Sequence, residues 1–454
     1  MKSPQAKLSW GRKLGYASGD FALNLFFTFT SLFLLYYYTD IVGLSPTVGG
    51  LIIMAALVWE GVIDPLMGVV ANRTRSRWGR YRPYILFGSV PLAISFVAMF
   101  VPTGVTGTAL VVYAFATHLL FRTLYTVVGI PLIAMSADMT RDTLERSTIA
   151  GARMLFATGC GLTLATATLP LVRFWGGGQI GFFKLSILYS LLALIVLAIV
   201  FRSSVTATAD AEAHHPKVPG YGEMLTMVRA NQPFQLLLGA IMLASVGGTA
   251  TSKMLLYYIK YHVGSEALVT PALMLSTATV AASIVPWVYV TRWTSKRFVW
   301  LCGTAISFLT YILLFILAPG REPLLWALIA MGGVGSGAYA LTFWSMVPDT
   351  VEYGEVRTGI RAEGALYGLV SLSQKVALGI GIGLLGVLLD TIGYHANVVQ
   401  TKDTLDGILI LLTLVPAAFA LGAGALIWFY PLDRATHAGL LRELATRPTS
   451  PDSI

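Results

Sequence analysis

Residues 46–72 read PTVGGLIIMAALVWEGVIDPLMGVVAN, an apolar run that carries only two charged side chains. A helix of this length crosses the hydrocarbon core of a bilayer, which is about 30 Å thick. Similar runs recur along almost all of the 454 residues, of which 56% are hydrophobic and 12% are charged. Since about 25% of the residues of soluble domains are charged, the composition excludes most soluble folds and predicts a membrane protein.

The apolar runs divide into twelve predicted spans, which must be helices because backbone polar groups in lipid have to be paired within their own segment. The spans are 15–38, 46–72, 83–101, 109–138, 148–171, 181–200, 235–262, 269–290, 298–317, 323–347, 365–392 and 404–430. We therefore predict an all-α membrane fold with an N-terminal six-helix bundle over 1–202 and a C-terminal one over 234–430. The polar stretch 203–233 is the predicted linker, and 431–454 is the predicted tail.

The basic residues predict the orientation of the chain. Most of the 31 Lys and Arg lie in the loops on the side of the two termini, with a dense cluster between Arg73 and Arg82. By the positive-inside rule, both termini are then cytoplasmic in a bacterial-type inner membrane. The same pattern accounts for the net charge of +9, so we expect no nucleic acid partner. We expect a monomer in the lipid bilayer.

Signatures of enzymes and metal sites are missing from the sequence. It has no phosphate-binding Gly-Lys-Ser/Thr loop, no metal-spaced His/Cys cluster and no GxSxG elbow. Cys160 and Cys302 lie inside apolar runs, which supports neither a disulfide framework nor a thiolate metal site. We therefore predict a carrier without enzymatic activity, cofactor or bound metal, driven by an ion gradient or by downhill flow.

Glu60 and Asp64 are the acidic residues of the second span, and their spacing puts them one turn apart on one helical face. Two carboxylates this close in a low-dielectric site stay ionised comfortably only when a proton or a cation lies between them. The pattern predicts a cation-coupling site. The alternative is a structural pair that Arg122 of the fourth span neutralises.

Other ionisable residues also lie inside spans, where each costs roughly 2.5–3.5 kcal/mol on insertion scales, so they should face a protein interior or a watery cavity. In the fourth span, His118, Arg122 and Thr126 form a polar stripe at successive i, i+4 positions. His118 is either a satisfied interior histidine or a proton relay. The remaining interior charges are Asp20, Arg153, Lys375 and Lys253, the last of which has the alternative of snorkelling toward an interface.

Several motifs extend these observations. They are GDF at 19–21, YYTD at 37–40, DPLMG at 64–68, TRSRWGR at 74–80, VPDTVEYGE at 347–355, TGIRAEG at 358–364 and WFYPL at 428–432. In these motifs, and through almost its whole length, the chain resembles the glycoside-pentoside-hexuronide:cation symporter family of the major facilitator superfamily. The resemblance implies two six-helix bundles that give alternating access to a midplane site, and symport of a sugar derivative with a cation.

The resemblance also implies a coupling site. Sodium-coupled members carry an acid-x-x-Asn-Asp pattern on the second helix and a Thr on the fourth, where this chain has Glu60, Ile63, Asp64 and Thr126. Ile63 replaces an oxygen ligand, and Arg122 lies one turn from Thr126. The predicted coupling residues are therefore Glu60, Asp64, Thr126 and Arg122, with a proton favoured over sodium.

For the substrate, Asp20, Arg153 and Lys375 match the family's sugar-binding acid, arginine and lysine on the first, fifth and eleventh helices. Gly129 and Ile133 stand where the fourth helix of some members has a sugar-binding Asp and a stacking Trp, and Tyr125 of this stretch completes the predicted substrate residues. A hexuronide, another acidic sugar or a glycoside with an apolar aglycone fits better than a neutral galactoside. The alternatives are a carrier of a lipid-like amphiphile and a non-transporting receptor.

A charged segment follows the tenth span. Opposite charges here would pair with the basic loops 73–82 and 141–146 when the cytoplasmic side is closed. We therefore predict a cytoplasmic gate, the alternative being a solvated loop that only fixes topology. The predicted gate residues are Asp349, Glu352, Glu355 and Arg361.

Overall fold

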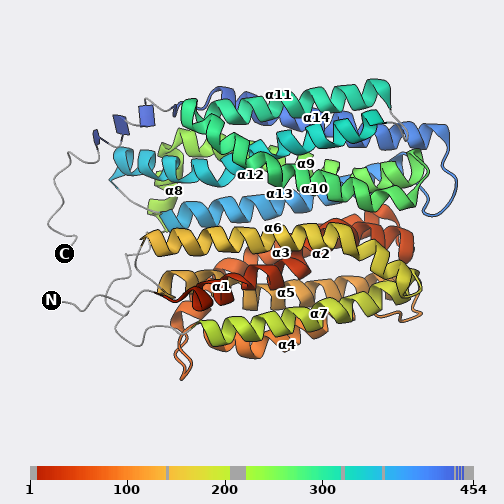
Figure 1. Ribbon diagram of the computed structural model, residues 1–454, viewed down its shortest axis with the longest axis horizontal. Helices are drawn as coiled ribbons and strands as arrows, with labels where there is room; N and C mark the ends of the chain where they lie inside the picture. Colours follow the sequence, from red (N-terminus) through yellow and green to blue (C-terminus); the bar gives the residue numbers. More distant parts are fainter. Residues whose placement is uncertain are drawn as a thin grey trace. The chain divides into compact units, whose positions relative to one another are not determined.

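The computed structural model describes residues 8–139, 143–204, 221–318, 323–359, 363–433, 436, 437, 439, 440, 442 and 443. All regular elements of this part of the chain are helices, as Figure 1 shows, which confirms the predicted all-α membrane fold. Eleven helical stretches among these residues are long and apolar enough to cross a membrane. The third predicted span corresponds to a shorter apolar helix, α4 (Arg82–Ala98).

The chain divides into two compact units. The first comprises Met1–His215 and Ile382–Val399, and the second comprises Pro216–Gly381 and Gln400–Ile454. The bundle boundaries drawn from the sequence stay a prediction. They place 382–399 in the C-terminal bundle, whereas this stretch groups with the first unit.

In the first unit, α3 and α4 both pack against α5, and α4 and α7 lie side by side (Figure 1). Its first apolar helical stretch spans Trp10–Ile41, with Ser18 between α1 and α2. The elements of this unit are α1 (Trp10–Ala17), α2 (Gly19–Tyr36), the π-helical turn η1 (Tyr37–Ile41), α3 (Pro46–Arg73), α4, α5 (Gly107–Met139), α6 (Thr143–Phe174), α7 (Gly178–Ser203) and the C-terminal part of α13 (Glu363–Thr391).

Aromatic side chains fill the interior of the first unit. Phe26 and Phe29 of α2 pack edge to face against Phe96 of α4, with ring centroids 4.8 and 5.5 Å apart. Phe29 also packs edge to face against Tyr189 of α7 at 5.7 Å, and all four side chains are buried. Each such pair contributes about 0.5–1.5 kcal/mol beyond its buried area. The cluster fixes α2, which carries Asp20, against α4 and α7.

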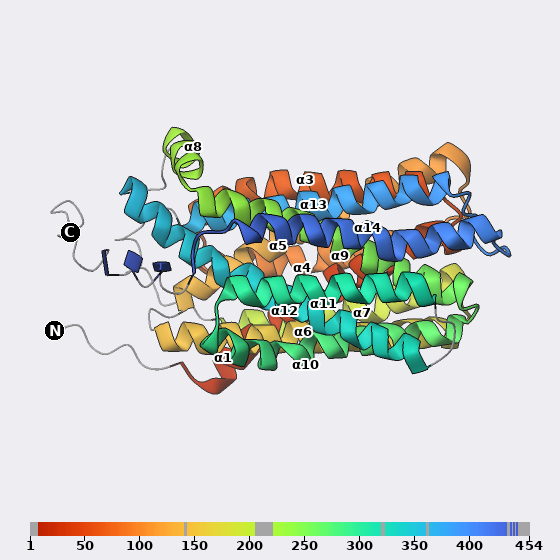
Figure 2. The same ribbon diagram turned by 90° about the horizontal axis from the view of Figure 1, so that it is seen from above.

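In the second unit, α12 packs against both α10 and α11 (Figure 2), and α14 packs against α9 and α11. The elements are α8 (Tyr221–Ala230), α9 (Gln232–Tyr257), the π-helical turn η3 (Tyr258–His262), the 3₁₀ turn η4 (Glu266–Leu268), α10 (Val269–Trp293), α11 (Lys296–Leu317), α12 (Pro323–Thr358), the N-terminal part of α13 and α14 (Lys402–Trp428).

Helix α12 runs well past the span end predicted at 347. It continues through Pro348 to Thr358, although proline removes a backbone donor and clashes with the preceding turn. Met346, Val347 and Val351, on either side of the proline, are buried in the core of the second unit. This packing holds the helix together where the local sequence alone would end it.

Described parts of the predicted linker and tail belong to the core of the second unit. The predicted linker 203–233 contains α8, whose Met227 is fully buried in the same core as Phe234. After α14, Tyr430 and Leu432 are 1% and 5% exposed in that core, so the chain is still packed where the tail was predicted to begin.

Gly50 of α3 and Gly386 of α13 allow two helices to meet at backbone distance within the first unit. A Cβ atom at Gly50 would lie 2.8 Å from the carbonyl oxygen of Ile382, and one at Gly386 would overlap the carbonyl oxygen of Pro46. Beside this contact, the N–H of Thr47 donates to Asp390 Oδ2 at 2.9 Å. Small residues commonly serve this purpose between membrane helices.

We predict that Gly386→Leu lowers the apparent melting temperature of the purified protein in detergent. The new side chain has to displace the backbone of α3, and overpacking of this kind costs roughly 1–3 kcal/mol. Gly368→Leu on the same helix is the matched control, because a Cβ atom there meets nothing within 4 Å. Equal effects of the two substitutions would contradict the close-packing interpretation.

Candidate substrate and coupling site

Asp20 and Arg153 form an ion pair between two helices of the first unit. Asp20 lies in the first turn of α2, shortly after Ser18. Arg153 Nε of α6 donates to Asp20 Oδ2, and Nη2 donates to Oδ1 at 3.2 Å. The side chain of Asp20 is 16% exposed and that of Arg153 is 20% exposed, so water still reaches the pair. The structure thus brings two of the predicted substrate residues into a bidentate contact.

The other two predicted substrate residues lie on different helices. Tyr125 of α5 stacks on Phe27 of α2 with ring centroids 6.1 Å apart. A Cβ atom at Gly129, one turn further along α5, would lie 3.8 Å from the Tyr125 ring. Lys375 is half-buried on the part of α13 that belongs to the second unit. Its approach to Asp20 and Arg153 therefore stays a prediction.

Arg122 is held inside the first unit by side chains from three helices. Its Nη1 donates to Glu60 Oε2 of α3 at 2.9 Å, in an ion pair whose side chains are 2% and 0% exposed. Its Nε donates to His118 Nε2 one turn earlier on α5 at 3.1 Å, and its Nη2 makes a longer bond of 3.4 Å to Thr30 Oγ1 of α2. Removing one member of such a buried pair costs roughly 3–5 kcal/mol.

Asp64 lies in a different environment from Glu60. It is half-buried, and its Oδ1 accepts a hydrogen bond from Thr126 Oγ1 of α5 at 2.7 Å. Successive polar residues of α5 therefore engage successive acids of α3, Arg122 with Glu60 and Thr126 with Asp64. The four predicted coupling residues do meet, but in two pairs that differ in charge and in access to water.

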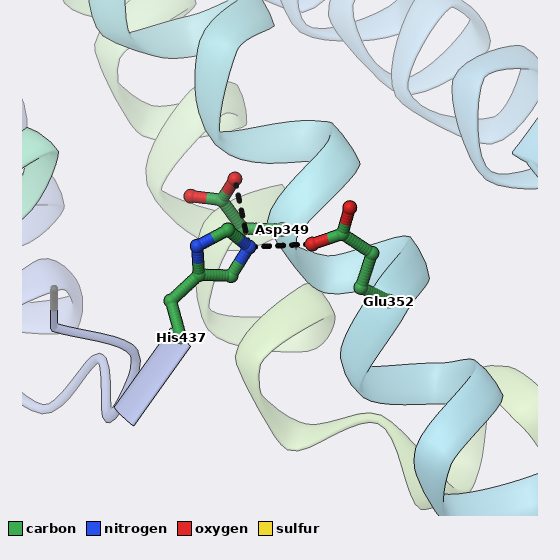
Figure 3. A group of neighbouring side chains, drawn as sticks. All are labelled: Asp349, Glu352 and His437. Atoms are coloured by element: carbon green, nitrogen blue, oxygen red, sulfur yellow. Dashed lines mark hydrogen bonds and ion pairs between the residues drawn. The ribbon is translucent and has the colours of Figure 1, made fainter. Parts of the chain in front are cut away.

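The predicted gate residues Asp349 and Glu352 lie on α12 and pair within the second unit. Lys296 Nζ of α11 donates to both carboxylate oxygens of Asp349, at 2.7 and 2.9 Å. Figure 3 shows the ring of His437 between the two acids. Its Nε2 lies 2.5 Å from Glu352 Oε2 and 3.6 Å from Asp349 Oδ1. Glu355 is half-buried on the same helix.

Sequence reasoning did not find these partners of the gate acids. Lys296 follows the eighth predicted span in a short basic loop, a position whose spacing gives no information about α12. His437 belongs to the predicted tail, where no pattern indicated a folded contact. Arg361, together with Arg141 and Asp142 of the predicted basic loop 141–146, lies outside the described residues, so the predicted pairing of the gate with the basic loops stays a prediction.

Asp349, Glu352 and His437 could in principle hold a metal ion, because their ligand atoms lie within 4.8 Å of one another. Two observations favour a hydrogen-bonded ion cluster instead. The ammonium of Lys296 already neutralises Asp349. The 2.5 Å between His437 and Glu352 is shorter than the ~3.3 Å that separates two ligands of a tetrahedral zinc ion with ~2.0 Å bonds.

Comparisons with known proteins agree with the motifs. The family model for an MFS/sugar transport protein matches residues 15–434. The glucuronide carrier protein homolog of Escherichia coli (strain K12) is 31% identical, over 97% of this chain and 96% of that protein. The isoprimeverose transporter of Lactiplantibacillus pentosus is 29% identical, over 94% of this chain and 89% of that protein.

Solved structures share the fold at low sequence identity. A crystal structure of a variant of the nucleoside transporter NupG has a TM-score of 0.70 at 13% identity, and the alignment covers 93% of this chain and 100% of that one. The chain therefore belongs to the MFS/sugar transport protein family and, as its motifs predicted, to the glycoside-pentoside-hexuronide:cation symporters of the major facilitator superfamily, which are membrane-spanning secondary active transporters.

Proposed function

We propose that this protein couples the import of a hexuronide, another acidic sugar or a glycoside to a proton gradient by alternating access. The sugar-type substrate is supported by relatives named as a glucuronide carrier homolog, an isoprimeverose transporter and a putative glycoside/cation symporter. None of these names describes a lipid-like amphiphile, so the relatives do not favour that alternative.

The ion pair between Arg122 and Glu60 is the observation that carries the proton assignment. A sodium ion needs several oxygen ligands to replace its hydration shell. Glu60 already binds a guanidinium, and position 63 is an isoleucine. Among the predicted coupling residues, Asp64 and Thr126 lie outside that ion pair, and a proton needs only one oxygen atom.

The two acids also differ in their access to the transported ion. Glu60 is 0% exposed and bound by the fixed positive charge of Arg122, so we assign it a structural role in this ion pair. Asp64 is half-buried and bonded to a neutral hydroxyl. Protonation of Asp64 would remove a negative charge from the membrane interior, which is the free-energy change that a coupling site has to supply.

The ion pair between Asp20 of α2 and Arg153 of α6 supports the proposal that these two residues bind the sugar. A carboxylate and a guanidinium held side by side offer acceptors and donors to sugar hydroxyls, and they cancel each other's charge. An acidic sugar would then need a further cation, and Lys375 is the predicted residue for that role. This combination fits a hexuronide better than a neutral galactoside.

We predict that proteoliposomes containing the protein accumulate substrate under an imposed proton gradient and do not accumulate it under a sodium gradient at constant pH. Asp64→Asn should abolish accumulation but leave downhill exchange, because the variant keeps the volume and the hydrogen bonding of Asp64 without its titrating charge. The measurement is uptake of a labelled glucuronide under each gradient. Accumulation driven by sodium alone at constant pH would overturn the proton assignment.

We also predict that Asp20→Ala weakens ligand binding by ~30-fold or more, because removing one partner of a hydrogen-bonded charge pair costs roughly 2 kcal/mol or more. Thermal shifts of the purified variant with glucuronides, neutral glycosides and lysophospholipids measure this change and the ligand class together. Asp403→Ala, an exposed acid in the first turn of α14, is the control. Wild-type affinity with unchanged selectivity in Asp20→Ala would remove Asp20 from the substrate site.

A further inference from the structure

We infer that His118 is a positioning residue for coupling: it holds the guanidinium of Arg122 on Glu60 and thereby keeps it away from Asp64. This inference rests on the proposed role of Asp64 as the coupling carboxylate. It assigns a function to a histidine that the sequence left open between a satisfied interior residue and a proton relay.

The hydrogen bond between Arg122 and His118 defines which ring nitrogen of the histidine carries hydrogen. Arg122 Nε always carries its hydrogen, so His118 Nε2 accepts at 3.1 Å and its lone pair is used. The ring is then neutral, with its hydrogen on Nδ1. A histidine in this state cannot take a second proton at Nε2 while the bond lasts, which argues against a proton relay.

The contacts around Arg122 restrict its guanidinium to one orientation. Nε, Nη1 and Nη2 point to acceptors on α5, α3 and α2. The guanidinium carbon lies 5.6 Å from the ring centroids of both Phe27 and Phe121. Because the guanidinium is planar, fixing Nε fixes the direction of the two terminal nitrogens. His118 is therefore the contact that aims Nη1 at Glu60.

The alternative acceptor for Arg122 is close. Glu60 and Asp64 are one turn apart on α3, so their Cβ atoms are separated by roughly 5–6 Å. An arginine released at Nε could cover that distance by rotating its side chain. It would then compete with Thr126 for Asp64 and place a tethered positive charge where the transported proton binds. The carrier would lose the link between substrate and proton but keep its substrate site.

Burying a histidine at position 118 costs free energy. It is 0% exposed, and its Nδ1 has no hydrogen-bond partner among the described residues. A buried polar atom without a partner costs roughly 1–3 kcal/mol. An apolar side chain would avoid that cost, so packing alone does not account for a histidine here, whereas an acceptor aimed at Arg122 does.

The experiment compares His118→Met with His118→Gln in proteoliposomes. The two side chains have similar volumes, but only glutamine offers an oxygen that can accept from Arg122 Nε. We expect His118→Met to lower proton-driven accumulation by about tenfold or more while exchange of substrate across the membrane stays within about threefold of wild type. His118→Gln should accumulate substrate close to the wild-type level.

Two further variants separate positioning from folding. Thr117→Val, at the neighbouring residue whose hydroxyl bonds only carbonyls of its own helix in the described structure, should behave as wild type. If His118→Met does not fold, His118→Leu provides the same comparison.

The outcomes distinguish this inference from the proposed function. Wild-type accumulation in His118→Met, with Asp64→Asn inactive in accumulation, would overturn the positioning role alone. Parallel loss of exchange and accumulation in both His118→Met and His118→Gln would indicate a purely structural histidine and would also overturn it. Wild-type accumulation in Asp64→Asn would instead remove the proposed coupling carboxylate.

Discussion

A guanidinium buried in a membrane-spanning helix needs a countercharge close by, and the first unit is arranged around that constraint. Arg122 is 2% exposed, and a charge at such a position is among the most unfavourable groups in a membrane protein. Glu60 supplies the countercharge from α3, while His118 and Thr30 accept the other N–H groups. Since the acceptors come from α2, α3 and α5, the ion pair also fixes how these helices are rotated against one another.

The same ion pair separates two carboxylates that would otherwise form one site. Glu60 and Asp64 share a helical face, so without Arg122 each would raise the free energy of the other's ionised form. Glu60 is paired with the guanidinium of Arg122, whereas Asp64 accepts a hydrogen bond from the neutral hydroxyl of Thr126. One exchangeable carboxylate is the simplest arrangement for one transported proton. The residues that make Glu60 structural are therefore as much a part of the proposed coupling as Asp64.

The sequence predicted what depends on periodicity and failed where contacts depend on distant residues. Span length and hydropathy indicated the helices, and the four-residue spacing placed His118, Arg122 and Thr126 on one face of α5. Spacing defines a face but not a partner, so it could not choose between Glu60 and Asp64 for Arg122. Lys296 and His437 lie 53 and 85 residues from the acids they contact. Likewise, α12 continues through Pro348 because of tertiary packing that no local pattern contains.

Helix α13 has residues in both units. Its N-terminal part, with Lys375, belongs to the second unit, and its C-terminal part is fastened to the first. Asp390 accepts from Thr47, Asp40 accepts from Tyr394 at 2.9 Å, and the backbone of Asp40 accepts from Asn397 at 2.5 Å. Alternating access therefore requires α13 either to release these contacts or to bend between them and Lys375. Gly379, Gly381 and Gly383 lie in that interval. A Cβ atom at Gly381 would lie 3.2 Å from Thr249 of α9 within the second unit, and one at Gly383 would lie 2.8 Å from Met54 of α3 within the first, so these glycines let α13 pack closely against a helix of each unit.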